Sequence, residues 1–182
     1  GADGLVRAQA PLSRGSAAVG QAVLMKKAFF LLAAALAVPA AAQSPTRSPP
    51  RSITYETGPC FGRCPVYSVT VYSNGRATFV GQRFTAVTGT REFRVSPGTY
   101  RALARHLEPI RPQRGDIRYS GDRCRSMATD MPSTTVIWHE PGGRRSLYFY
   151  YGCDMQRNRA LADRLRRAPD LLPLGDFIGR SR

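Results

Sequence analysis

The sequence predicts an α+β fold, a small antiparallel sheet built of hairpins with two packed helices. Two stretches, residues 66–80 and 134–151, alternate apolar and polar residues on either side of a turn, which is typical of β-hairpins. Two further stretches, residues 97–107 and 155–168, space their apolar residues as one face of a helix does. The chain has 182 residues, 42% hydrophobic and 21% charged, so its composition is that of a globular protein and its length suits one domain.

The first elements form the most clearly marked hairpin. Residues 52–57 predict a short strand, and residues 66–72 alternate as a second strand. Asn74-Gly75 follows, and because both residue types tolerate a positive φ, this pair is a strong hairpin signal. Residues 77–80 then form the returning strand.

The next stretch predicts two more strands and a helix. Residues 82–88 and 90–95 are strand candidates separated by a glycine. Ser96 is a favoured N-cap with Pro97 at the first helical position, and prolines end the helix after residue 107. Apolar residues at helical spacing give this helix one face for packing on the sheet: Tyr100, Leu103, Ala104 and Leu107.

The second half of the chain predicts a long loop, a second hairpin and a second helix. Residues 111–133 are polar and rich in Gly, Asp and Arg, and loops of this length are usually functional or disordered. Residues 134–151 form the hairpin. Asp154 is a candidate N-cap for a helix that runs to Ala168, after which residues 170–178 fold back as a short apolar tail.

A three-part leader pattern precedes the predicted domain. Met25-Lys26-Lys27 is positively charged, residues 28–38 are apolar, and small residues stand before Gln43, which is the layout of a secretory signal peptide. The apolar run is shorter than the roughly 20 residues that span a bilayer as a helix. Because Gln43 rather than a cysteine follows the predicted cleavage point, we expect no lipid anchor.

These features predict an exported protein, periplasmic or secreted, with a single domain. We interpret residues 1–24 as an over-extended gene start, with a genuine N-terminal extension as the alternative. The remaining segments are then a signal peptide (25–42), a flexible tether rich in proline (43–51), the α+β domain (52–168) and a C-terminal tail (169–182). Removing residues 1–42 takes away four basic residues and one acidic residue, which leaves 23 arginines, 11 acidic residues and a net charge of +12 instead of +15. No other apolar run is long enough for an integral membrane segment.

All four cysteines lie in the predicted domain: Cys60, Cys64, Cys124 and Cys153. Export would place them in an oxidising environment, which favours disulfides. Four cysteines allow three pairings. We favour Cys60–Cys64, on one tight loop bent at Gly62, together with Cys124–Cys153, which flank the second hairpin.

Cys60 and Cys64 also suggest a thiol-redox pair in which Arg63 lowers the pKa of a thiol. The pair lacks the two-residue spacing and the βαβ context of thioredoxin-like sites. A zinc site would need His106 or His139, and neither has a second ligand three or four residues away. We therefore expect structural disulfides, no metal and no cofactor.

The segment from Gly58 to Tyr67 reads Gly-Pro-Cys-Phe-Gly-Arg-Cys-Pro-Val-Tyr, and it resembles the motif of a family of bacterial exported domains of unknown function. Members of that family are often lipoproteins or follow a signal peptide. The resemblance runs from about Ser52 to Leu165 and is most specific in the motif itself. It implies export and a shared fold, and it implies no chemistry. This chain differs from lipid-anchored members because no cysteine stands at the cleavage point.

The sequence favours a non-enzymatic role, and we assign no catalytic residue. A hydrolase needs a nucleophile and a base held together, and no Gly-x-Ser-x-Gly, His-Glu-x-x-His or Walker-type motif is present in the sequence. His106 falls on the first predicted helix and His139 at a strand end, each without an evident charged partner. We interpret both histidines as structural or solvated.

The long loop and the motif loop predict an anion-binding surface because they concentrate arginines: Arg63, Arg111, Arg114, Arg118, Arg123 and Arg125. Guanidinium groups match carboxylates and phosphates. An anionic component of the cell envelope, or an envelope protein, is therefore the expected partner. The alternative is that the arginines serve solubility alone.

Nucleic acid is a further alternative, because Tyr148, Tyr150 and Tyr151 could stack on bases beside these arginines. Predicted export argues against nucleic acid as the partner in the cell. Our first hypothesis is a non-catalytic, exported or envelope-associated interaction module stapled by disulfides. A thiol-redox protein and a protein that binds anionic polymers or nucleic acid remain the alternatives.

Overall fold

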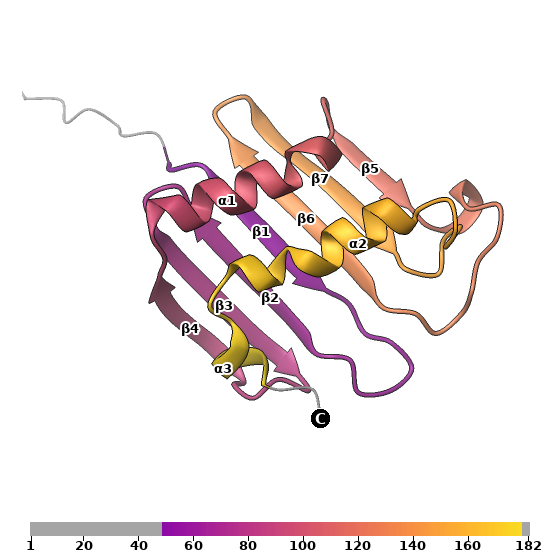
Figure 1. Ribbon diagram of the computed structural model, residues 1–182, viewed down its shortest axis with the longest axis horizontal. Helices are drawn as coiled ribbons and strands as arrows, with labels where there is room; N and C mark the ends of the chain where they lie inside the picture. The colour runs from indigo at the N-terminus through magenta and orange to yellow at the C-terminus, as the bar shows by residue number, and fades with distance from the viewer. Residues whose placement is uncertain (1–48, 180–182) are drawn as a thin grey trace, which may run out of the picture. The chain divides into compact units, whose positions relative to one another are not determined.

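The computed structural model describes residues 49–179, and these form one seven-stranded sheet with helices packed on it (Figure 1). The strands are β1 (Ser52–Thr57), β2 (Val66–Tyr72), β3 (Arg76–Arg83), β4 (Gly89–Arg94), β5 (Asp116–Tyr119), β6 (Ser133–Glu140) and β7 (Gly143–Tyr150). Their order across the sheet is β4-β3-β2-β1-β6-β7-β5. Neighbouring strands are antiparallel except β5 and β7, which are parallel. This arrangement confirms the predicted α+β class.

The central strand β1 holds the two predicted hairpins together. It pairs with β2 on one side and with β6 on the other. The turn between β2 and β3 confirms the prediction from Asn74-Gly75, because Gly75 has a φ of +83° and its N–H donates to the carbonyl of Tyr72 at 2.9 Å. The backbone carbonyl of Val95 would also lie 2.6 Å from a Cβ at Gly75, so this turn has no room for a side chain.

Three α-helices and three short 3-10 helices complete the fold: α1 (Pro97–Leu107), η1 (Glu108–Ile110), η2 (Gly121–Arg123), α2 (Arg159–Arg167), η3 (Pro169–Leu171) and α3 (Gly175–Ile178). The start of α1 confirms the predicted cap, because the Ser96 hydroxyl accepts a hydrogen bond from the N–H of Thr99 at 3.0 Å. Such a cap contributes about 1 kcal/mol to helix stability.

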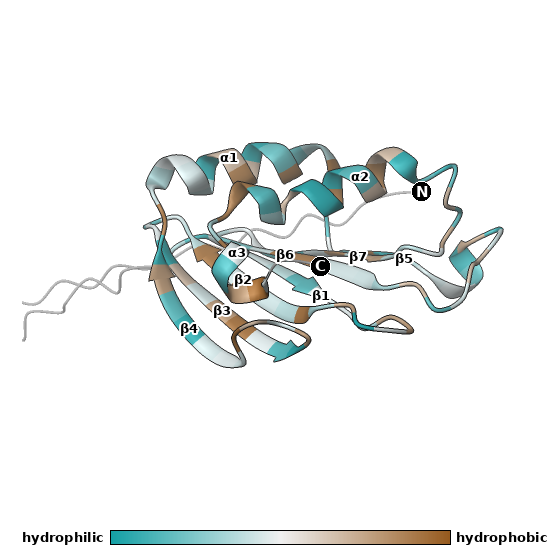
Figure 2. Cartoon of the chain, turned by 60° about the horizontal axis from the view of Figure 1, so that its bottom comes forward, coloured by the Kyte–Doolittle hydropathy of each residue, from teal (hydrophilic) through white to brown (hydrophobic). Residues whose placement is uncertain are grey.

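The hydrophobic core lies between one face of the sheet and the helices, and α1 and α2 cover this same face side by side (Figure 2). The alternation in each strand directs its apolar side chains toward the helices, which is why the sheet buries one face only. The most deeply buried large side chains are Phe79, Phe149, Leu103, Leu107, Leu165 and Leu174.

The opposite face of the sheet carries mainly hydroxyl side chains; most are half-buried, and Ser52 and Ser146 are buried. Thr54 and Thr70 are cross-strand partners whose hydroxyl groups lie 2.8 Å apart. Tyr148 lies on this face too, next to Thr135 of the neighbouring strand. No helix among residues 49–179 covers this face.

The prediction of a separate strand at residues 82–88 is wrong. The strand β3 continues to Arg83, and the chain then turns back across Gly81, where any Cβ would collide with the carbonyl of Val87. The turn is held from the C-terminal side, because the Val87 N–H donates to the carbonyl of Phe177 at 3.0 Å. The alternating pattern that suggested a strand here therefore belongs to a turn, and this turn is hydrogen-bonded to the C-terminal segment.

The predicted loop at residues 111–133 contains β5 and η2, which the sequence reasoning missed. The strand β5 has only four residues and pairs along β7 in parallel, with Ile117 opposite Leu147. A short strand of this kind is stabilised by a distant partner, so its own sequence carries little signal.

The predicted start of the second helix at Asp154 is also wrong, because α2 begins at Arg159. Residues 151–158 form turns instead, and Asp154 has a φ of +43°. Its carboxylate caps backbone N–H groups of another segment, as described below. The predicted gene start, signal peptide and residues 43–48 of the tether lie outside the described residues.

Candidate functional site

The disulfide between Cys124 and Cys153 joins the long loop, residues 111–133, to the segment after β7. Cys124 and Cys153 have their Cα atoms 5.3 Å apart, and this is the pairing that the sequence favours. Beside them, the Ala128 N–H donates to the carbonyl of Gly152 at 2.9 Å, so the two segments run antiparallel for a short distance. Gly152 has no space for a Cβ, because the carbonyl of Ala128 would collide with it.

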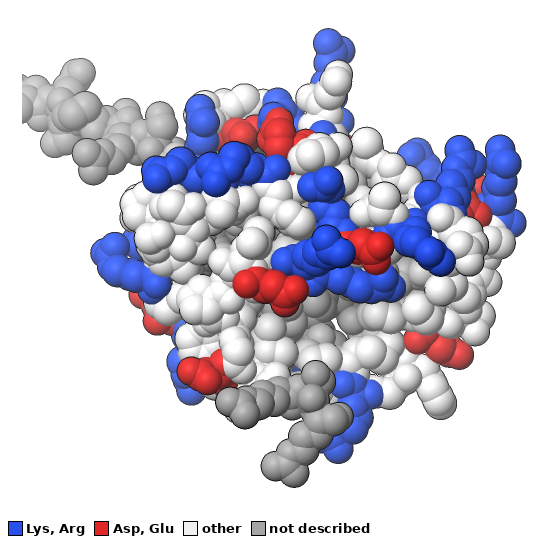
Figure 3. All heavy atoms as spheres, viewed as in Figure 1, with Lys and Arg blue, Asp and Glu red and all other residues white. Residues whose placement is uncertain are grey.

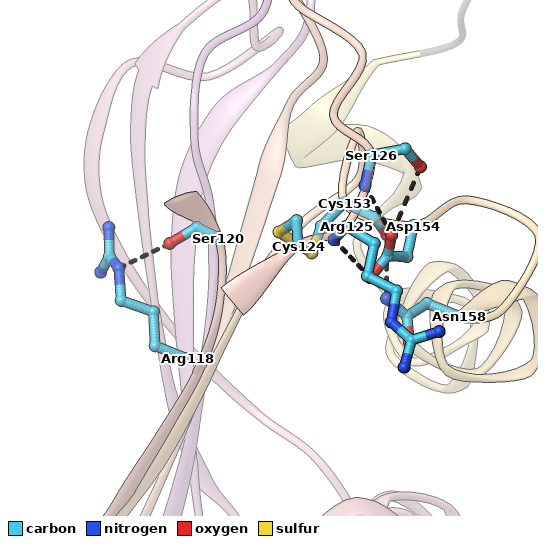
Figure 4. The surroundings of a disulfide bond; sticks show 8 residues. All are labelled: Arg118, Ser120, Cys124, Arg125, Ser126, Cys153, Asp154 and Asn158. Carbon is cyan, nitrogen blue, oxygen red and sulfur yellow. Dashed lines mark hydrogen bonds between the residues drawn. A yellow bond between two sulfur atoms is a disulfide. The ribbon is translucent and has the colours of Figure 1, made fainter. Parts of the chain in front are cut away.

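Asp154 fastens the same loop by accepting two backbone hydrogen bonds. Its carboxylate oxygens receive the N–H of Arg125 at 3.2 Å and the N–H of Ser126 at 2.8 Å (Figure 4). These hydrogen bonds hold the pKa of Asp154 below its usual range, because they favour the ionised carboxylate. The carboxylate is thereby engaged with the backbone beside the disulfide.

The structure separates the six arginines that the sequence predicts as one anion-binding surface. Arg111 forms ion pairs with Glu108 and with Glu140, the latter at 2.8 Å, so its charge is already matched. Arg118 stacks on the Tyr148 ring at 3.8 Å on the open face of the sheet. These two arginines therefore serve local contacts.

The other four predicted arginines also lie on different parts of the molecule. Arg63 lies at the tip of the motif loop, 5.7 Å from the centre of the Phe84 ring, whereas Arg114 and Arg123 are exposed near β5. Figure 4 shows Arg118 and Arg125 on opposite sides of the Cys124–Cys153 disulfide. Only Arg125 reaches the groove described next.

A groove runs along α2 and consists of three adjoining hollows. The first has a volume of about 510 Å³ and is lined by Arg125, Met127, Asp154, Met155 and Arg157, among others. The second has about 390 Å³ and lies between α2 and β7, over Phe149 and Tyr151. Met155 and Gln156 line both of these hollows, so the two hollows adjoin. The third, of about 290 Å³, shares Tyr151 and Arg166 with the second.

Four arginines line this groove: Arg125, Arg157, Arg159 and Arg166. Two aspartates line it as well, and both are engaged, because Asp154 accepts backbone hydrogen bonds and Asp163 pairs with Arg166 at 3.3 Å. Figure 3 shows arginine atoms gathered over α1 and α2 on the helical face. The groove thus combines excess positive charge with an apolar base.

Three of these four arginines were missed by the sequence reasoning, which looked for basic residues in loops. The signal was present, because residues 157–167 contain five arginines against one aspartate. Helix α2 is strongly amphipathic, so burial of Ala162 and Leu165 directs its charged side chains outward along the groove.

The motif of residues 58–67 forms the end of the groove furthest from the Cys124–Cys153 disulfide. Cys60 and Cys64 are bonded, with Cα atoms 5.8 Å apart, and Phe61 at the loop tip is 87% exposed. Gly58, Cys64, Pro65 and Tyr67 of the motif line the third hollow. All four cysteines are in disulfides. The thiol-redox alternative stays a prediction.

Tyrosine hydroxyl groups meet below this end of the groove. The Tyr55 hydroxyl donates to the carbonyl of Leu165 at 3.1 Å, and the Tyr151 hydroxyl lies 3.2 Å from the Thr134 hydroxyl oxygen. Burial raises the pKa of Tyr55 and Tyr67 well above the usual tyrosine value, and it also raises the pKa of Tyr151. The Tyr55 hydroxyl is thus protonated at neutral pH and serves as the hydrogen-bond donor to the Leu165 carbonyl.

The structure does not bring together the three tyrosines that suggest nucleic-acid binding. Tyr148 and Tyr150 project from the open face of the sheet, whereas Tyr151 is buried toward α2. Arg118 covers Tyr148, and the Tyr150 hydroxyl accepts the N–H of Met131 at 3.2 Å. A shared stacking surface is therefore not formed by these residues.

The histidines lie on separate elements. The His106 ring donates through Nε2 to the carbonyl of Arg164 at 2.8 Å, and the Arg164 guanidinium donates to the carbonyl of His106 at 2.7 Å. This reciprocal pair joins α1 to α2. His139 is exposed near the end of β6. Within residues 49–179, no group of three or more His, Cys, Asp or Glu side chains is placed to hold a metal ion.

None of the described helices is long and apolar enough to cross a membrane. Residues 51–170, about two thirds of the chain, match the family described as a domain of unknown function (DUF6438). The match includes both disulfides, the motif loop and α2. No curated protein and no solved structure matches the chain.

Proposed function

The chain belongs to the DUF6438 family of domains of unknown function, and from this premise and its groove we propose that it is an exported, non-catalytic interaction module that binds an anionic envelope component beside α2. One observation carries the proposal: four arginines and only two aspartates line three adjoining hollows beside α2, and Asp163 pairs with Arg166. An anionic ligand would match this excess charge, because guanidinium groups bind carboxylates and phosphates in a bidentate manner.

Export is supported by the leader pattern of residues 25–42 and by two disulfides, which persist in oxidising compartments. Sequencing the N-terminus of the protein recovered from the cell exterior or periplasm tests this part. We expect a mature chain that begins at Gln43. A mature chain that begins near Gly1 would contradict the cleavage.

The non-catalytic role is supported by the surroundings of the histidines. The ring of His106 is engaged with the Arg164 carbonyl, and His139 lies on a different element. Neither residue lines the three hollows of the groove. A general base must lie within hydrogen-bond reach of the group it deprotonates, so these positions favour binding over hydrolysis.

The binding proposal is tested with labelled poly-glutamate and with polyphosphate, followed by fluorescence anisotropy. The double variant Arg157→Gln/Arg159→Gln removes two charges from the groove, and we expect it to weaken binding roughly tenfold at low salt. The matched control is Arg91→Gln/Arg94→Gln, which removes two exposed charges from β4 at the far edge of the sheet. Equal losses in both double variants would contradict the proposal, because net charge alone would then explain binding.

A further inference from the structure

The third hollow of the groove, called the motif pocket from here on, differs from the other two in its lining. It lies between the motif and the C-terminal end of α2 and contacts Pro65, Pro132, Pro169 and Ile178. Its volume of about 290 Å³ is at the lower end of small-molecule sites. Such a lining favours an apolar ligand group of modest size.

The motif side of this pocket is held in place by Thr57. Its hydroxyl donates to the carbonyl of Pro65 at 2.8 Å and accepts the N–H of Tyr67 at 3.0 Å. The Tyr67 ring is also stacked on Phe79, with ring centres 5.4 Å apart. The shape of the pocket is therefore fixed before a ligand arrives, which lowers the entropic cost of binding.

The Tyr67 hydroxyl is a donor at the pocket surface with no protein acceptor. Tyr67 is 5% exposed and lines the pocket, yet its hydroxyl has no hydrogen-bond partner among residues 49–179. By contrast, the hydroxyls of Tyr55 and Tyr151 both have partners. An unused donor beside an apolar hollow is satisfied when a ligand supplies an acceptor.

Arg166 brings a guanidinium to the same pocket, and this group also pairs with Asp163, with 3.3 Å between Nη1 and Oδ1. Its guanidinium lies 4.7 Å from the centre of the Tyr151 ring, and the residue is exposed at the boundary between the second hollow and the motif pocket. A single arginine and a single hydroxyl donor match one carboxylate.

We propose that the motif pocket binds a carboxylate-ended amphiphile, with its alkyl chain against the prolines and Ile178 and its carboxylate held by Tyr67 and Arg166. This inference rests on the proposed binding role of the groove and names the chemical class of ligand at one end of it. The family-like motif then has a function beyond its disulfide, because it builds one side of a ligand site.

Decanoate is the probe, titrated into the purified full chain by isothermal titration calorimetry. Three single variants each alter one part of the pocket: Ile178→Trp fills it, Tyr67→Phe removes the donor and Arg166→Gln removes the charge. We expect Ile178→Trp and Arg166→Gln to weaken binding about tenfold or more, and Tyr67→Phe to weaken it severalfold. Decanol, which lacks the carboxylate, should bind about tenfold more weakly than decanoate to the unaltered protein.

Two results would overturn the inference. One is that decanoate does not bind the unaltered protein, and the other is that folded Ile178→Trp and Arg166→Gln variants bind it unchanged. Arg166 is on the surface, so its variant keeps the test valid even if the tryptophan variant does not fold. The Arg157→Gln/Arg159→Gln variant separates the two proposals: it should lose poly-glutamate binding and keep decanoate binding.

Discussion

The two disulfide-closed segments differ in what they hold. Cys124 and Cys153 are 29 residues apart, and Cys153 is buried among backbone hydrogen bonds that join the long loop to the turn before α2. Cys60 and Cys64 are only four residues apart and close a loop whose tip is exposed. The first bond ties distant parts of the chain together, whereas the second shapes a local surface next to the motif pocket.

This difference suggests why one small domain has both kinds of bond. Closing a long loop removes more conformational freedom from the unfolded chain than closing a short one. We therefore expect the Cys124–Cys153 disulfide to contribute mainly to folding stability, and the Cys60–Cys64 disulfide mainly to the geometry of the proposed motif pocket. Each of the following predictions tests that division.

The largest effect is expected when the Cys124–Cys153 disulfide is removed. In Cys124→Ser/Cys153→Ser, the free energy of unfolding should fall by about 3–4 kcal/mol, because the unfolded chain regains the freedom of a loop of about 30 residues. Urea denaturation followed by circular dichroism measures this loss. If the loss does not exceed that of the short-loop variant, the proposed division between the two bonds is wrong.

The short-loop variant Cys60→Ser/Cys64→Ser should lose about 2 kcal/mol or less of unfolding free energy. Its larger effect should be on the motif pocket, because Cys64 and Pro65 line it, so decanoate affinity should drop severalfold while poly-glutamate affinity stays unchanged. The thiol-redox alternative is tested on the unaltered protein by an insulin-reduction assay. Activity that disappears in this variant would favour that alternative.

A smaller, pH-dependent effect is expected at Asp154. Its pKa is lowered in the folded protein by the N–H groups of Ser126 and Arg125, so its contribution to stability is complete above the unfolded aspartate pKa, near 4, and is lost as the pH falls through the lower folded pKa. Asp154→Asn should therefore be less stable than the unaltered protein at pH 7. Thermal melts between pH 2 and pH 7 should show this difference shrinking at low pH, and a constant difference would contradict the assignment.

The smallest effect is expected at the tip of the short loop. Phe61 is 87% exposed, so Phe61→Ser should change the free energy of unfolding by less than about 0.5 kcal/mol. The same denaturation experiment measures it. A loss above about 1 kcal/mol would mean that the loop tip packs on the domain. The two disulfide-closed segments would then differ less in their contribution to stability.

Local signals in the sequence predicted the elements that local contacts determine. Asn74-Gly75 and the Ser96 cap act within a few residues, so their structures followed from residue type alone. The short strand β5 was missed because its partner β7 lies far along the chain. Asp154 was misread because its carboxylate serves the distant backbone of Ser126 instead of its own helix.

The candidate site was less predictable for the same reason. The groove forms only when α2 packs beside β7 and when the motif loop meets the C-terminal end of that helix. Arg111 and Arg118 belong to the same predicted loop and were therefore expected on one surface. In the fold they lie on different surfaces. Charge along α2 was visible in the sequence, but its role depended on which face the core buries.

The direction of β1 decides how the protein can be attached or handled. This strand enters the sheet at Ser52, beside Tyr72 and His139, and leaves it at Thr57, where the motif pocket begins. The strand has six residues, so its two ends lie roughly 17 Å apart. Anything joined before residue 51 therefore enters at the end of the sheet away from the pocket, whereas Ile178, near the C-terminus, lines it. We therefore expect that attaching the protein through the residues just before β1 leaves the proposed motif pocket accessible to solution.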